Sequence, residues 1–218
     1  MTYYSRYRHL AIKRAKPPPT ESELAVIETL LGAHLPASFR DFLRVANGGY
    51  LEYVIDVATG SGKTEPLCFG HLFSADKGTF CDRTFVGEIR TAREYQKVPQ
   101  GVLPFARDGG ACIVYLDLSP KGNGRVVAFV TGLPEWAGSR TKSAFIELAS
   151  SFDEYVAKLR IERDAVIDQL GDDPTNVADV DAIEEWLDIG MPSWREDSEL
   201  VTILCEARHR LTPRSGGG

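Results

Sequence analysis

The chain has 218 residues, of which 43% are hydrophobic and 26% are charged, an ordinary composition for a globular protein. This length fits one domain of about 150 residues with an added segment. A formal net charge of −6 disfavours wholesale binding to nucleic acid or anionic lipid.

Two helices are predicted near the start. Thr20 and Glu23 have capping-box spacing, in which each side chain satisfies a free backbone N–H of the other residue, and Gly32 supplies the stop. A second helix opens at Leu35-Pro36, where the missing N–H of proline costs nothing. We expect Asn47-Gly48-Gly49 to end it, since Asn and Gly tolerate the left-handed conformation of a helix terminus.

The pattern then changes to strands. Residues 50–57 alternate apolar and polar side chains and predict one strand, and a second is expected over 66–74. A helix is expected over 85–92. Turn residues, including Asp108-Gly109-Gly110, separate three further apolar runs and favour an antiparallel meander. Those three strands are expected over 102–106, 111–118 and 125–131.

The C-terminal part is predicted to be helical. One long amphipathic helix is expected to carry five apolar side chains at helical spacing: Phe145, Leu148, Phe152, Tyr155 and Leu159. Asn176 is expected to cap the next helix, which Gly190 and Pro192 terminate. A last helix carries Leu200 and Leu204.

The stretch VATGSGKT, residues 57–64, looks like a phosphate-binding loop. The pattern GxxxxGK[ST] requires glycine where this chain has Val57. Pro66 and Gly70 also prevent the helix whose N-terminal amides would hold the anion. A hairpin loop explains the stretch better, and a nucleotide-binding enzyme is kept as a remote alternative.

The residue types typical of metal and catalytic sites show no useful spacing. The cysteines, Cys68, Cys81, Cys112 and Cys205, form no CxxC pair, and the four histidines are scattered. We expect reduced, mostly buried thiols, and we predict no metal, no cofactor and no catalytic residues. No segment has the roughly 18 apolar residues of a membrane span, and the N-terminus lacks a signal peptide, so we expect a cytoplasmic protein.

Two motifs carry a family resemblance. LPASFRDFLRVANGGY, residues 35–50, and LPFARDGG, residues 103–110, resemble the SUKH superfamily, which contains bacterial immunity proteins of polymorphic toxin systems and a fungal cell-wall assembly regulator. The likeness covers residues 20–160. It implies an α+β fold, with an antiparallel sheet of about five to six strands flanked by helices, and a non-enzymatic binding role. The motif positions implied to define turns and helix ends are Leu35, Pro36, Asn47, Gly48, Gly49, Asp108, Gly109 and Gly110.

Charge is distributed unevenly around this likeness. Residues 1–16 carry five Lys or Arg and no acid, whereas residues 164–194 carry nine Asp or Glu and no Lys or Arg. Two solvated faces are the simplest explanation. We expect four parts: a basic N-terminal arm (1–19), a SUKH-like domain (20–160), an acidic helical extension (161–211) and a flexible tail (212–218).

The leading functional hypothesis is an immunity protein that binds and neutralises a cognate bacterial toxin by direct contact. A basic nuclease domain would suit an acidic surface, because complementary charge speeds association. A regulatory or scaffolding module without a toxin partner is the alternative. No nucleic-acid or membrane partner is expected, and the oligomeric state is left open. The candidate partner-binding acids are Asp172, Asp173, Asp179, Asp181, Glu184, Glu185 and Asp188.

Overall fold

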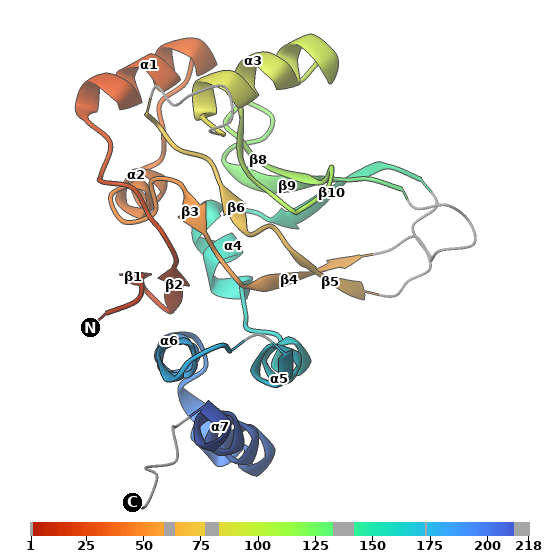
Figure 1. Ribbon diagram of the computed structural model, residues 1–218. Coiled ribbons are helices and arrows are strands. Elements are labelled where there is room, and N and C mark those ends of the chain that lie inside the picture. Colours follow the sequence, from red (N-terminus) through yellow and green to blue (C-terminus); the bar gives the residue numbers. More distant parts are fainter. Residues whose placement is uncertain (1, 59–63, 77–82, 133–141, 173, 212–218) are drawn as a thin grey trace, which may run out of the picture.

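The computed structural model describes residues 2–58, 64–76, 83–132, 142–172 and 174–211, and its architecture is α+β (Figure 1). The main sheet has six strands in the order β10-β9-β8-β7-β6-β3, and every neighbouring pair is antiparallel. The fold class expected from the sequence is therefore confirmed. The strands are β3 (Gly49–Tyr50), β6 (His71–Leu72), β7 (Val102–Arg107), β8 (Ile113–Asp117), β9 (Arg125–Val130) and β10 (Ala144–Ala149).

The meander of β7, β8 and β9 forms where the sequence predicts it. On β9, Val126, Ala128 and Val130 are buried while the residues between them are partly exposed, as a half-buried strand requires. Asp108 shapes the turn between β7 and β8, because its Oδ1 accepts hydrogen bonds from the N–H groups of Gly110 (2.8 Å) and Cys112 (3.0 Å). Local turn chemistry thus sets the pairing of these strands.

An aromatic cluster packs two short helices, α2 (Ala37–Leu43) and α4 (Phe152–Lys158), against the sheet. Phe39 is fully buried, with its ring centroid 4.9 Å from that of Phe152 and 5.6 Å from that of Phe105 on β7. The rings meet edge to face, a favoured geometry for aromatic pairs.

Two longer helices, α1 (Glu21–Leu31) and α3 (Phe85–Tyr95), pack against each other beside the sheet. Both halves of the predicted capping box are present at Thr20 and Glu23, and Gly32 adopts φ = 70° at the other end of α1. A second hydrophobic cluster joins Ala92 of α3 to Ile113 of β8. Helices therefore lie on both faces of the central strands, which explains why β8 is buried throughout.

Four element boundaries differ from the sequence predictions, one of them at residues 66–74, which divide between a strand over 64–68 and β6. Helix α2 ends at Leu43 rather than at Asn47. Asn47 lies beyond the helix, where its backbone forms an antiparallel bridge with Lys16. Residues 50–57 divide between β3 and a separate strand. Phe145 and Leu148 lie on β10, where Phe145 pairs with a residue of β9, and not on a long helix. The prediction was wrong because a short apolar run fits the periodicity of a helix as well as that of a strand.

Two small hairpins complete the β structure. β4 (Val54–Ala58) pairs antiparallel with β5 (Thr64–Cys68), and β1 (Ser5–Tyr7) pairs with β2 (Leu10–Ile12). Leu10 and Ile12 are fully buried, so part of the segment expected as a basic arm contributes to the core.

The C-terminal helices lie beside the N-terminal hairpin, as Figure 1 shows. They are α5 (Arg163–Asp172), α6 (Val177–Gly190) and α7 (Ser198–Leu211), with the short 3₁₀ helix η2 (Pro192–Glu196) between the last two. Asn176 forms the predicted cap of α6. One hydrophobic cluster runs from Leu10 through the sheet to Ala207, although the division of the chain at residue 160 stays a prediction.

Gly49 is the most constrained of the motif glycines. Its φ is +97°, and a Cβ there would lie 2.6 Å from the carbonyl oxygen of Lys13. We predict that Gly49→Ala lowers the free energy of unfolding by about 1–3 kcal/mol, through backbone strain and this collision.

Urea denaturation followed by circular dichroism measures the Gly49→Ala effect. Gly109→Ala is the control, because nothing lies within 4 Å of a Cβ at Gly109. Equal stabilities of the two variants would contradict the predicted strain and collision at Gly49.

Candidate partner-binding site

The motif Asn47-Gly48-Gly49 connects the N-terminal segment to the rest of the fold. The Asn47 side chain, 3% exposed, donates from Nδ2 to the carbonyl of Pro17 (2.7 Å) and accepts at Oδ1 from the N–H of Ala75 (2.7 Å). Gly48 and Gly49 both have positive φ. The motif thus occupies backbone positions that few other residues could take.

The other motif residues also lie at ends of elements. The N–H of Leu35 donates to Oε1 of Glu28 (2.9 Å), and Pro36 immediately precedes α2. Gly109 and Gly110 lie in the turn that Asp108 shapes. The eight motif residues thus lie at turns or near the ends of helices and strands. The resemblance implies the same kind of position for them.

The candidate acids are spread along the extension. Asp173 and the side chain of Asp172 lie outside the described residues. Asp179 belongs to the capping box of α6, where it accepts from the N–H groups of Thr175 (2.8 Å) and Asn176 (3.2 Å). These hydrogen bonds, that of Thr175 first, lower the pKa of Asp179. The primary role of the Asp179 side chain is therefore to cap the start of α6.

Two arginines neutralise the next acids on α6. Arg208 contacts Asp181 (2.6 Å) and Glu184 (2.7 Å), and Arg195 contacts Glu184 (3.1 Å) and Asp188. These pairs are partly exposed, so each contributes little stability, about 0–1 kcal/mol. The two arginines do reduce the negative electrostatic field of α6. The sequence does not show this pairing, because both arginines come after the acidic run in the chain.

The remaining described acid, Glu185, accepts a hydrogen bond from the N–H of Tyr3 (3.0 Å). All five candidate acids whose side chains are described therefore have partners within the fold. As a partner-binding surface they remain a prediction.

An ion pair also ties α5 to the start of α7. Nε of Arg163 lies 2.6 Å from Oδ2 of Asp197, and Asp197 accepts from the N–H of Leu200. The guanidinium of Arg163, followed by that N–H, lowers the pKa of Asp197 from its ordinary 3.8 to about 2. Because the folded value is lower, the stabilisation is complete above about pH 4 and disappears as the pH falls towards 2.

We predict that Asp197→Asn reduces the loss of stability between about pH 4 and pH 2, since the group that titrates is gone. Thermal melting across this pH range is the measurement. Asp168→Asn, at an exposed acid of α5 that forms no ion pair with any described residue, is the control. Identical acid dependence in wild type and Asp197→Asn would contradict the prediction.

The phosphate-loop likeness lacks its structural context. Residues 59–63 lie outside the described residues, but Thr64 begins β5, which pairs with β4 as a hairpin. A phosphate loop would require a helix there, with its N-terminal amides facing the anion. The antiparallel pairing of β4 with β5 is the one that the expected hairpin requires.

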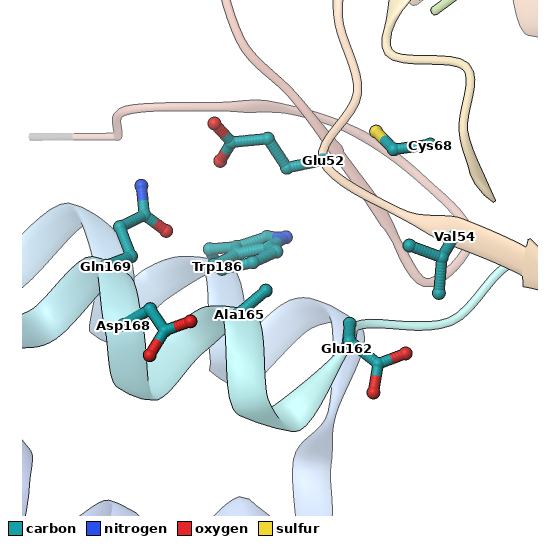
Figure 2. Close-up of a pocket in the computed structure, with 8 residues that line it drawn as sticks. All are labelled: Glu52, Val54, Cys68, Glu162, Ala165, Asp168, Gln169 and Trp186. Carbon is teal, nitrogen blue, oxygen red and sulfur yellow. The ribbon is translucent and has the colours of Figure 1, made fainter. Parts of the chain in front are cut away.

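Two neighbouring cavities form a groove between the extension and the rest of the fold. The first measures about 410 Å³ and the second about 450 Å³, and Gln169 lines both. Figure 2 shows the first cavity between α5 and α6 on one side and the chain around Glu52 and Val54 on the other. We call this combined feature the Trp186 groove, after the indole in its wall.

Carboxylates dominate the charge of the first cavity. Glu52 pairs with Lys13 (2.7 Å), and Glu162 pairs with Arg160 (2.7 Å). Asp168 is exposed and has no ion pair or hydrogen bond to any described residue.

Two buried polar atoms at the groove have no partner in hydrogen-bond geometry, the indole N–H of Trp186 and the hydroxyl of Tyr4. Burial, followed by the carboxylates of Glu52 and Glu185, raises the pKa of Tyr4. The Trp186 ring packs edge to face on Tyr53, at 6.2 Å between centroids.

The hydroxyl of Tyr53 is already committed to other groups. It donates to the carbonyl of His9 and accepts from the N–H of Ala11. Burial raises its pKa to about 12, against the opposing effects of the Ala11 N–H and the Trp186 indole. The indole N–H of Trp186 is thus directed towards the Tyr53 hydroxyl, although it does not reach hydrogen-bond geometry.

The described part of the chain offers few groups for metal binding or for cysteine chemistry. It contains no group of three or more His, Cys, Asp or Glu residues placed to hold a metal ion. Cys112 is buried and Cys68 half-buried, but Cys205 is exposed, contrary to the expectation of mostly buried thiols. Cys81 lies outside the described residues. None of the helices in the described ranges is both long and apolar enough to cross a bilayer.

The sequence analysis missed the groove. Its carboxylates, Glu52, Glu162 and Asp168, come from distant parts of the chain and share no motif spacing. No local signal in the sequence marks Trp186 as a residue of this groove.

The fold is α+β, a sheet covered by helices, and the groove gives it a concave surface at one end. A family model described as the SMI1 / KNR4 family (SUKH-1) matches residues 18–158, and the chain belongs to this family. No curated protein matches the chain. Most of the residues that line the groove, including Tyr4, Asp168 and Trp186, lie outside the matched range.

Proposed function

We propose that this protein is an immunity protein, which binds a cognate bacterial toxin domain and neutralises it by direct contact. The observation that carries the proposal is the family match over residues 18–158. Immunity proteins of polymorphic toxin systems are among the members of the wider superfamily, and the family suggests a role in protein–protein interaction. The concave groove beside the family region supplies a surface on which a partner can be held.

A basic toxin, such as a nuclease domain, suits the net charge of −6. Opposite charge raises the rate of encounter even where it adds little affinity. The acidic extension supports this choice of partner, although Arg195 and Arg208 compensate part of its charge. A regulatory scaffold without a toxin partner remains the second candidate, because the wider superfamily also contains a fungal cell-wall assembly regulator.

Co-expression tests the proposal directly. The toxin domain encoded beside this gene should arrest growth when expressed alone, and the full chain should restore growth and co-purify with the toxin. The physical reason is occlusion of the toxic site by a bound protein. A toxin domain from an unrelated locus is the control.

The regulatory alternative predicts different results. It predicts neither protection nor binding to the neighbouring toxin domain. Failure of both readouts with purified, folded chain would overturn the immunity proposal.

The acids of α6 can be tested in the same complex. Asp181→Asn, Glu184→Gln and Asp188→Asn combined should slow toxin association by about threefold to tenfold and weaken its salt dependence, because Arg195 and Arg208 become uncompensated. Stopped-flow kinetics over a range of salt concentrations measures this. Asp179 is left intact, since its loss would damage the cap of α6. Unchanged kinetics would remove these acids from the binding surface.

A further inference from the structure

The first cavity of the Trp186 groove has an apolar floor and an acidic rim. Val54, Ala165 and the Trp186 ring provide the floor. Glu52 lines the cavity from one side, and Glu162 and Asp168 line it from the α5 side, with their carboxylates directed away from Glu52. A long basic side chain matches this combination, because its methylene stem packs on apolar surface while its charged head remains near carboxylates.

One negative charge at this cavity is uncompensated. No Lys or Arg is among the residues that line it. Lys13 and Arg160, the cations that contact its rim, are each paired with one of its carboxylates, while Asp168 has no partner among the described residues. A lysine or arginine from outside would pair with Asp168 without displacing an existing ion pair. Arginine could also stack on the indole, which is a favoured partner for cations.

Trp186 contributes its ring, rather than its N–H, to the cavity. Trp186 is 4% exposed and lines the cavity, and its N–H has no partner in hydrogen-bond geometry. That nitrogen is buried and is directed towards the Tyr53 hydroxyl, so it offers no donor to an occupant. The occupant is therefore recognised by its cation and its methylene stem.

We propose that the first cavity of the Trp186 groove binds a lysine or arginine side chain on an exposed segment of the protein partner; the second cavity, lined by Lys13 and Arg14, is not part of this site. The inference rests on the proposed function and specifies where the partner docks. Most of the groove-lining residues belong to the segments outside residues 18–158, so partner choice resides in the parts of the chain that are added to the family domain.

Two variants on α5 test the groove. Asp168→Lys reverses the unpaired charge, and Ala165→Trp fills the cavity from an exposed position. Glu196→Lys makes the same charge change at an exposed residue of η2, and Ala178→Trp adds an indole at an exposed position of α6; neither position lines a described cavity. Circular dichroism confirms that all four variants are folded.

The first probe is a blocked peptide of alternating Gly and Arg, titrated into the full chain, with a Gly–Glu peptide for comparison. NMR follows the indole N–H resonance of Trp186, assigned with Trp186→Phe. We expect a saturable shift with the Arg peptide alone, weakened by about tenfold in Asp168→Lys but by less than about twofold in Glu196→Lys. The absence of a shift at Trp186, or equal weakening in both variants, would overturn the proposal.

The second probe is the toxin domain encoded beside this gene. If wild type binds it and both α5 variants bind at least about tenfold more weakly than their controls, the groove is the docking site. If all variants bind equally, the docking proposal fails while the immunity function stands. If wild type does not bind the toxin, the immunity function fails, and the peptide titration alone decides whether the groove takes a basic segment.

Discussion

The close approach of two backbone segments at Gly49 determines how the rest of the molecule is assembled. The carbonyl oxygen of Lys13 lies where a side chain of Gly49 would begin, and two hydrogen bonds of 2.8 and 2.9 Å join the backbones of Lys13 and Tyr50. This contact fixes the N-terminal segment against the start of the sheet. Leu10 and Ile12 then enter the same hydrophobic cluster as α6, so the position of the extension depends on a glycine in the family motif.

The matched and added segments therefore have different roles in one continuous structure. The family region supplies the sheet, its turns and the aromatic cluster around Phe39. The residues on either side of the β1–β2 hairpin, together with helices α5 and α6, supply most of the groove wall. Since the stability of the sheet does not depend on the carboxylate of Asp168, side chains at the rim can differ without loss of the fold, which is a physical basis for choosing among partners.

Charge shows why residue counts do not define a surface. Nine acids without a basic residue predict a strongly negative face over 164–194. In the structure, Arg195 and Arg208 follow that run and turn back onto Asp181, Glu184 and Asp188. The unpaired carboxylate of Asp168 is on α5 instead, beside the groove. Electrostatic arguments about partners therefore require the ion pairs as well as the net charge.

The sequence by itself determined the features that depend on hydrogen bonds between near neighbours. The capping boxes at Thr20 and Asn176 and the turn at Asp108 join groups within about four residues, so their spacing is visible in the chain. Tertiary structure decided the rest. Residues 144–149 fit either a strand or a helix until β9 pairs with them, and the groove brings Trp186 to Glu52 across the folded chain. Contacts between distant residues leave no periodicity or spacing in the sequence, because folding alone brings such residues together.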